Sequence, residues 1–330
     1  MNLPRADDPA DRVLSVLLLT TSYPLGSDSV SGVFVQRLAR ALADVCRVQV
    51  LAPADSQAVV SADATPSVSV FRYAPQALQV LAHGAGGIPA ALGANRFNLL
   101  LVPFFLLSML FSCWRQAKGQ DVLFANWSIC GIVAGVVGRL RGIPVVVTLR
   151  GEDANRLETS LLFRWGVKLC GRLCACIVTV SEAMGAKLAA MPEFSHKLVV
   201  IPNGVSQAFL NVEPLRARDE RLQLLCVASL IPRKSIATLI RALAFTPPRV
   251  SLTLIGEGSE QDALMALAVE LGVRARVEFL PFQPPGKLPA YLASCDVLVL
   301  PSRAEGRPNV VLEAFAAGRP VIATAIDGLY

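Results

Sequence analysis

Short runs of valine, leucine and isoleucine recur along this 330-residue chain, and many of them are continuous. Continuous apolar runs are typical of parallel strands that are buried on both faces of a sheet. We expect strands at residues 13–20, 46–52, 121–125, 144–149, 176–180, 197–201, 222–228, 250–255, 276–280, 296–300 and 320–324. Helical patterns fall between them, at residues 32–43, 129–141, 234–244, 258–271 and 309–317. This alternation predicts an α/β fold with parallel sheets.

A polar and charged stretch that contains a proline, residues 206–221, divides the chain. We therefore expect two Rossmann-like domains, at residues 1–205 and 222–330, with residues 206–221 as the linker. Ligands of open parallel sheets bind outside the carboxyl ends of the strands. The two sheets are accordingly expected to face a cleft that holds the substrates.

Composition excludes several classes of protein. Hydrophobic residues make up 53% of the chain, which excludes intrinsic disorder. There are only two histidines, His83 and His196, and none of the eight cysteines forms a CxxC pair, so we expect no metal site. The cysteines are expected to be buried thiols of an intracellular protein, since the N-terminus carries no recognisable export signal.

The positive charge is concentrated in one part of the chain. Between Arg96 and Arg172 there are 10 basic and 4 acidic residues, which accounts for the whole net charge of +6. A local basic face indicates a specific anionic partner. Basic runs interleaved with aromatic residues are absent from the sequence, so we expect no binding to nucleic acid.

A loop rich in glycine and proline follows the strand expected at 296–300. Pro308 suits the first turn of the next helix, whose free amides and positive dipole end would bind an anion, most naturally a phosphate. The amides concerned are those of Asn309, Val310 and Val311. Glu305 and Glu313 add carboxylates that accept hydrogen bonds from a sugar diol or stabilise a developing cation.

A basic pair, Arg233 and Lys234, follows the strand expected at 222–228 and opens the next helix. Positive charge at the N-terminus of a helix opposes the helix dipole. An anion that binds there would explain the pair. Two exposed basic side chains are the alternative interpretation of this pair.

These segments together resemble retaining glycosyltransferase family 4, which has the GT-B fold. EGRPNVVLEAFAAGRPVIAT looks like the acidic motif of that family. The other matching segments, in chain order, are TTSYPLGSDSVSGVFVQRLARAL, DVLFANWSICGIVAG, VVVTLRGED, VTVSEAM, VIPNGV, LIPRKS and LIGEGSE. The resemblance implies transfer of a sugar from a nucleotide-diphosphate donor with retention of anomeric configuration.

The resemblance also implies site residues. In the catalytic set, Glu305 would stabilise the oxocarbenium character of the transferred sugar, Asp153 would touch the sugar or the acceptor, and Arg150 stands where the family often has histidine. The implied donor-binding residues are Gly32, Arg233, Lys234, Gly256, Asn309, Val310, Val311 and Glu313. Lys234 would neutralise the diphosphate and Glu313 would bind the ribose. Because the chain has no Asp-x-Asp motif, the resemblance implies neither a metal nor another cofactor.

Other functions stay open at this point. A dinucleotide site is disfavoured, since Gly256 and Gly258 lack the third glycine of that fingerprint. A nucleotide-sugar epimerase of GT-B fold and a non-catalytic, membrane-associated sugar-nucleotide-binding module remain as alternatives. The chain stops soon after residues 320–324, whereas the family continues, so we expect an incomplete second domain.

Two segments point to a membrane. Residues 97–114 carry no charge and approach the ~20 residues of a spanning helix, but strands on both sides should share one sheet, so we expect no crossing. This segment is either a core helix or a helix pressed into the inner leaflet. Arg164, Lys168 and Arg172 recur every fourth residue and form either a solvated helix face or a stripe that binds anionic membrane. We expect a protein peripheral on the cytoplasmic face of the cell membrane, with a lipid-linked or glycan acceptor of a bacterial-type envelope polysaccharide.

Overall fold

The structure is a computed structural model, and it describes residues 12–26, 32–55, 66–83, 87–151, 153, 157, 160–213 and 221–326. The chain forms two compact units. Unit 1 comprises Met1–Val178 and Ala189–Val199, and unit 2 comprises Thr179–Leu188 and Val200–Tyr330. Part of the expected linker lies outside the described residues, and another part forms helix α8, Gln207–Leu210. The domain boundaries at 205 and 222 stay a prediction.

The first sheet has seven strands in the order β3-β2-β1-β4-β5-β6-β7. They are β1 Ser15–Leu19, β2 Arg47–Pro53, β3 Ser67–Phe71, β4 Val122–Asn126, β5 Val145–Leu149, β6 Cys176–Thr179 and β7 Leu198–Val200. The first five pair in parallel, as predicted. Strand β3 was not predicted, because this five-residue edge strand has only three apolar residues and is buried fully only at Phe71.

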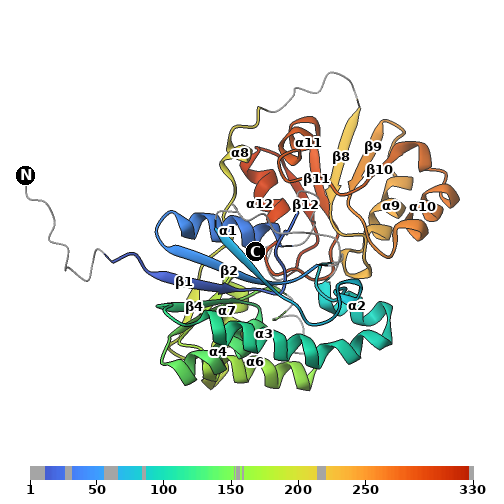
Figure 1. Cartoon of the computed structure of the whole chain (residues 1–330). Coiled ribbons are helices and arrows are strands. Elements are labelled where there is room, and N and C mark those ends of the chain that lie inside the picture. The colour runs from blue at the N-terminus through green and yellow to red at the C-terminus, as the bar shows by residue number, and fades with distance from the viewer. Residues whose placement is uncertain are drawn as a thin grey trace, which may run out of the picture. The chain divides into compact units, whose positions relative to one another are not determined.

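Helices cover both faces of this sheet, which is why its central strands are apolar on both sides (Figure 1). Helix α1, Val33–Ala43, lies on one face, and α3, α4 and α6 lie on the other. Among the described residues up to position 200, the other helical elements are η1 Gln76–Leu78, α2 Gly87–Ala94, η2 Arg96–Leu101, α3 Val102–Gln116, α4 Ser128–Arg141, α6 Leu161–Leu173, α7 Glu182–Ala189 and η3 Pro192–Phe194.

The uncharged segment forms η2 and α3, with Pro103 in the first turn of α3. Phe105, Met109 and Cys113 recur every fourth residue and are buried, which confirms the core interpretation for one face. Arg96–Gln116 is apolar and long enough to cross a membrane by composition, which is weak evidence by itself. Because β1 pairs directly with β4, the chain before and after this segment belongs to one sheet, as expected.

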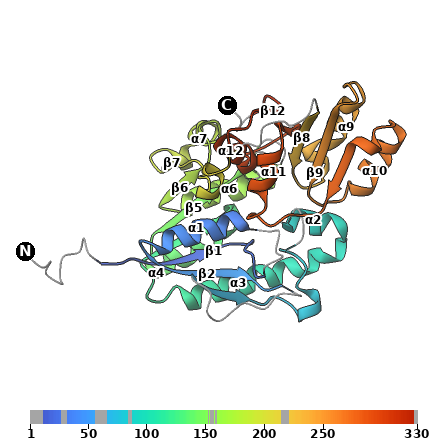
Figure 2. The ribbon, with the colours of Figure 1, turned by 90° about the horizontal axis from the view of Figure 1, so that it is seen from above.

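The second sheet has five strands in the order β10-β9-β8-β11-β12. They are β8 Leu222–Val227, β9 Val250–Ile255, β10 Val277–Leu280, β11 Val297–Leu300 and β12 Val321–Ala323. Helices α9, Ile236–Ala244, and α10, Gln261–Glu270, pack side by side on one face (Figure 2). Helices α8, α11, Leu288–Ser294, and α12, Asn309–Ala316, form a second core with the sheet. Two parallel sheets of this kind confirm the predicted α/β fold.

Candidate functional site

The chain changes direction in the second sheet between β8 and β11. From β8 it proceeds outward to β9 and β10, and then returns to β11 on the other side of β8. Strands β8 and β11 are neighbours, and the loops that follow them lead the chain in opposite directions across the sheet. This topological switch point is where open α/β sheets bind ligands.

Three contacts join these two loops. The Arg303 amide donates to the Arg233 carbonyl over 2.9 Å, and Arg233 Nη1 donates to the Ala304 carbonyl over 3.2 Å. The third contact is an ion pair in which Lys234 Nζ donates to Glu305 Oε1. Both side chains of this pair are largely buried. The structure thus brings together a cation and a carboxylate to which sequence analysis gave separate tasks.

Arg233 and Lys234 lie in η4, Pro232–Lys234, a 3-10 turn that precedes α9. The predicted helix 234–244 included Lys234, and that boundary was wrong. The backbone reverses hand at Ser235, whose φ of 51° lies in the left-handed region, so α9 begins only at Ile236. The basic pair therefore stands in the loop that follows β8.

Helix α12 begins at Asn309, and Pro308 is its N-cap instead of part of its first turn. Pro308 makes no side-chain hydrogen bond to the positive end of α12. Val311 donates its amide to the Pro308 carbonyl over 3.2 Å, so this amide is not free, contrary to the prediction. Val310 and Asn309 supply the two amides nearest the tip of the helix.

Asn203 holds the start of α12, and sequence analysis did not single it out. Its Nδ2 donates to the Arg307 carbonyl over 3.3 Å and to Asn309 Oδ1 over 2.9 Å. The only signal in the sequence was its place in the VIPNGV segment. Glu313, on the same helix as Asn309, is buried.

Gly256 follows β9 at a φ of 143°, and a Cβ there would lie 2.0 Å from the Ala228 carbonyl oxygen. Only glycine fits so close a backbone approach. Close packing of the backbone is therefore sufficient to explain a glycine at position 256. Its contact with a donor stays a prediction.

The first sheet has its own switch point, between β1 and β4. Gly32 caps α1 beside this point with a φ of 80°, and a Cβ there would lie 2.4 Å from the Ser22 carbonyl oxygen. Asp153 is buried, and its carboxylate accepts the Ser128 amide over 3.1 Å and the Arg150 amide over 2.9 Å. Asp153 therefore holds the start of α4 and the turn after β5, whereas its contact with a substrate stays a prediction.

Arg150 lies against the ring of Phe34, with 4.2 Å from its guanidinium carbon to the ring centroid. Its Nη2 donates to Asn126 Oδ1 over 3.3 Å. Burial lowers the pKa of Arg150 to about 10, and the charge of Asp153 acts in the opposite direction. Such a poorly hydrated cation on an aromatic ring favours an anionic or polar ligand.

Trp127 also belongs to this group, and sequence analysis missed it. It caps α4 with a φ of 68°, which is strained for a bulky residue, and its ring meets Phe34 edge-on at 5.8 Å. Nothing in the sequence signals such a backbone conformation at a tryptophan.

The predicted basic stripe lies on α6. Arg164 and Arg172 are exposed and Lys168 is half-buried. Glu193 Oε1 lies 3.8 Å from Lys168 Nζ and 3.2 Å from Arg172 Nη2, so the stripe is partly neutralised. An exposed apolar row runs beside it, made of Leu161, Trp165 and Leu169.

Among the described residues, the structure contains no group of three or more histidine, cysteine, aspartate or glutamate side chains arranged to hold a metal ion. All eight cysteines are free thiols, and six of them are buried.

Comparison with known proteins identifies both halves of the chain. Residues 31–204 match the family described as glycosyl transferase 4-like domain, and residues 210–330 match glycosyl transferases group 1. A glycosyltransferase of Methanocaldococcus jannaschii is 27% identical over 215 residues, which are 65% of this chain and 58% of that protein. A lipopolysaccharide core biosynthesis glycosyltransferase of Rhizobium meliloti is 43% identical over 98 residues, 30% of this chain and 28% of that protein.

The fold is that of solved structures with little sequence identity. Anabaena HepE, in complex with UDP and glucose, superposes with a TM-score of 0.71 at 23% identity, covering 96% of this chain and 82% of that one. This likeness confirms the predicted GT-B fold. The chain matches less than two thirds of the length of either relative named above.

Proposed function

The chain belongs to the glycosyl transferases of group 1, and we propose that it transfers a sugar from a nucleotide-diphosphate donor to an acceptor with retention of anomeric configuration. The observation that carries this proposal is the buried Lys234–Glu305 pair at the switch point of the second sheet. It places a cation beside a carboxylate where an α/β sheet binds its ligand.

The donor diphosphate would bind to Lys234, to Arg233 and to the first amides of α12. Phosphate oxygens then replace Glu305 as the partner of the ammonium group, and the freed carboxylate faces the sugar, where it stabilises positive charge in the transition state. Glu313 would bind the ribose. Arg233, Lys234 and backbone amides supply the positive charge, so the proposal needs no metal or other cofactor.

UDP is the first donor nucleotide to test, since Anabaena HepE is solved with UDP and glucose. The acceptor would be a lipid-linked or glycan acceptor of an envelope polysaccharide, as the name of the Rhizobium meliloti relative suggests for that protein. Within unit 1, Arg150 with Phe34, together with Gly32 and Asp153, would contact a substrate.

Membrane attachment is part of the proposal. Besides its buried face, α3 exposes Phe104, Leu107 and Phe111, and basic residues stand at both ends of the η2–α3 segment. Together with the basic and apolar rows of α6, this surface would hold the protein on the cytoplasmic face of an anionic membrane.

The test begins with thermal stabilisation of the chain by a panel of nucleotide sugars, followed by kinetics with the donor that stabilises it. Lys234→Ala should weaken binding of the corresponding nucleoside diphosphate about tenfold or more, since a charge-assisted hydrogen bond contributes roughly 1.5–3 kcal/mol. Glu305→Gln should lower kcat more than donor affinity, and Glu313→Gln should lower affinity.

Several outcomes would contradict the proposal. Conversion of the donor sugar in the absence of any acceptor indicates an epimerase. Donor binding without turnover, for any acceptor tried, indicates a binding module. Equal affinity of Lys234→Ala and the parent chain for the nucleoside diphosphate removes the proposed diphosphate site.

A further inference from the structure

Unit 1 contains a cavity of about 550 Å³ at the end of α6. It is lined by Arg139, Leu169, Arg172, Leu173, Pro192, Glu193, Ser195, His196 and Lys197. Helix α6 leads into β6, and residues 195–197 lead into β7, so the cavity lies at the amino ends of these strands. Arg150 and Asp153 follow the carboxyl end of β5 in the same parallel sheet. The cavity is therefore separate from the switch point of this sheet.

The lining carries an excess of positive charge. Three cations, Arg139, Arg172 and Lys197, face one carboxylate, that of Glu193, and His196 adds an imidazole. Like charges gathered in one cavity repel one another, and a compensating anion removes this cost. Such an excess in a concave surface favours an anionic ligand.

The end of α6 accounts for only part of this charge. Arg139 Nη2 donates to the Arg172 carbonyl over 2.7 Å, and Lys197 Nζ donates to the carbonyls of Cys174 and Gly171 over 3.1 and 3.3 Å. Cations are stabilised at the carboxyl end of a helix, where the last carbonyls lack partners. These bonds fix both side chains and leave further N–H groups of the guanidinium and ammonium for a ligand.

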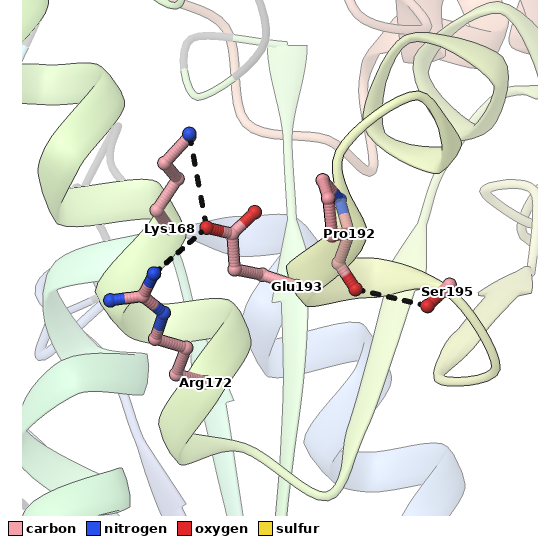
Figure 3. Close-up of polar contacts among 5 residues, drawn as sticks. All are labelled: Lys168, Arg172, Pro192, Glu193 and Ser195. Atoms are coloured by element: carbon pink, nitrogen blue, oxygen red, sulfur yellow. Dashed lines mark hydrogen bonds and ion pairs between the residues drawn. The ribbon is translucent and has the colours of Figure 1, made fainter.

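Glu193 fixes the third cation (Figure 3). Its Oε1 accepts from Arg172 Nη2 over 3.2 Å, with Lys168 Nζ at 3.8 Å. The pKa of Glu193 is lowered, chiefly by a hydrogen bond from its own amide and then by Lys168 and Arg172, so the carboxylate is ionised at neutral pH. Arg172 is thereby oriented along the rim of the cavity, with 60% of its side chain exposed to a ligand from solvent.

We propose that this cavity binds a phosphate ester, with Arg139, Arg172 and Lys197 on the phosphate oxygens. Guanidinium and ammonium groups held in place are the usual partners of phosphate. The carbon portion of the ester lies against Leu169 and Leu173. Leu169 also belongs to the exposed apolar row of α6, so the phosphate of a lipid headgroup and that of a soluble ester share this chemistry. The site is independent of the transfer reaction.

Calorimetry with the intact chain tests the site with sn-glycerol 3-phosphate, and with glycerol as the neutral control. Sedimentation with vesicles tests the lipid source: phosphatidate, a phosphomonoester, against phosphatidylglycerol, a phosphodiester, at equal surface charge. We expect glycerol 3-phosphate to bind and glycerol not to bind. Arg172→Gln should weaken binding about tenfold or more, as the loss of a charged hydrogen bond implies. Arg139→Gln/Arg172→Gln should abolish it.

Arg164→Gln is the matched control, since Arg164 lies on the same helix but does not line the cavity. It should leave glycerol 3-phosphate binding unchanged and lower vesicle binding equally for both lipids. A preference for phosphatidate that Arg172→Gln removes identifies the lipid source, and binding of the soluble ester without that preference identifies the soluble source. The proposal is overturned if glycerol 3-phosphate does not bind and the two lipids bind alike, or if Arg164→Gln loses as much ester affinity as Arg172→Gln. Arg139 also holds the end of α6, so the double variant could be unstable. In that case the single variant Arg172→Gln decides the test.

Discussion

Lys234 and Glu305 form an ion pair in which the side chains are 15% and 7% exposed, although 71 positions separate them in the chain. The pair joins the loops that follow two neighbouring strands, β8 and β11. A buried charge without a partner is costly. Each of these residues therefore has a structural role besides the role proposed for it in donor binding.

Lys234→Met should destabilise the protein by about 3–5 kcal/mol, because it leaves the Glu305 carboxylate buried without its cation. The double variant Lys234→Met/Glu305→Gln should recover most of this loss, since no buried charge then remains. Urea unfolding of both single variants and the double variant measures the coupling. Additive effects would show that the pair contributes nothing as a pair.

Asp153→Asn should destabilise unit 1 by about 1–3 kcal/mol, because its carboxylate accepts two backbone amides and is buried. The asparagine retains one acceptor oxygen and turns an N–H group toward a donor. Chemical denaturation measures the loss. An unchanged unfolding midpoint, together with a fall in turnover, would instead favour the substrate contact implied by the family resemblance.

Gly256→Ala should destabilise unit 2 more than Gly272→Ala. A Cβ at Gly256 would lie 2.0 Å from the Ala228 carbonyl oxygen, whereas at Gly272, with a φ of 67°, nothing lies within 4 Å. Alanine at Gly272 incurs only the left-handed backbone cost of about 1–2 kcal/mol. Thermal unfolding of both variants decides the comparison, and equal losses would contradict the backbone clash at Gly256.

Replacement of Phe104 and Phe111 by serine should weaken binding to anionic vesicles without loss of stability, since both rings are exposed on α3.

Reversal of Arg164, Lys168 and Arg172 to glutamate should release the protein from the same vesicles, as each basic residue near the surface contributes about 1 kcal/mol. Glu193 already pairs with Lys168 and Arg172, so Arg164→Glu should have the largest single effect. Sedimentation that neither change alters would favour a solvated helix face.

Prediction from the sequence succeeded where burial leaves a periodic signal. Residues 250–255 were predicted as a strand and form β9, because five of the six residues of Val250–Ile255 are buried and only Ser251 and Thr253 interrupt its apolar residues. The sequence did not show which face of α3 packs against the core, since an uncharged segment has no polar face to mark the exposed side. The structure decided it through the burial of Phe105, Met109 and Cys113.

By itself, the sequence determined most of the strands, the parallel sheets and the identity of the two loops that carry Lys234 and Glu305. These features follow from local patterns of hydrophobicity and from glycine and proline. Only the tertiary structure decided which side chains meet. Glu305 pairs with Lys234, Asp153 binds the amide of Ser128, and Asn203 binds Asn309, over separations of 71, 25 and 106 residues. Strand order determines these partners, because it places the ends of strands that are distant in the sequence side by side. No local sequence pattern predicts that order.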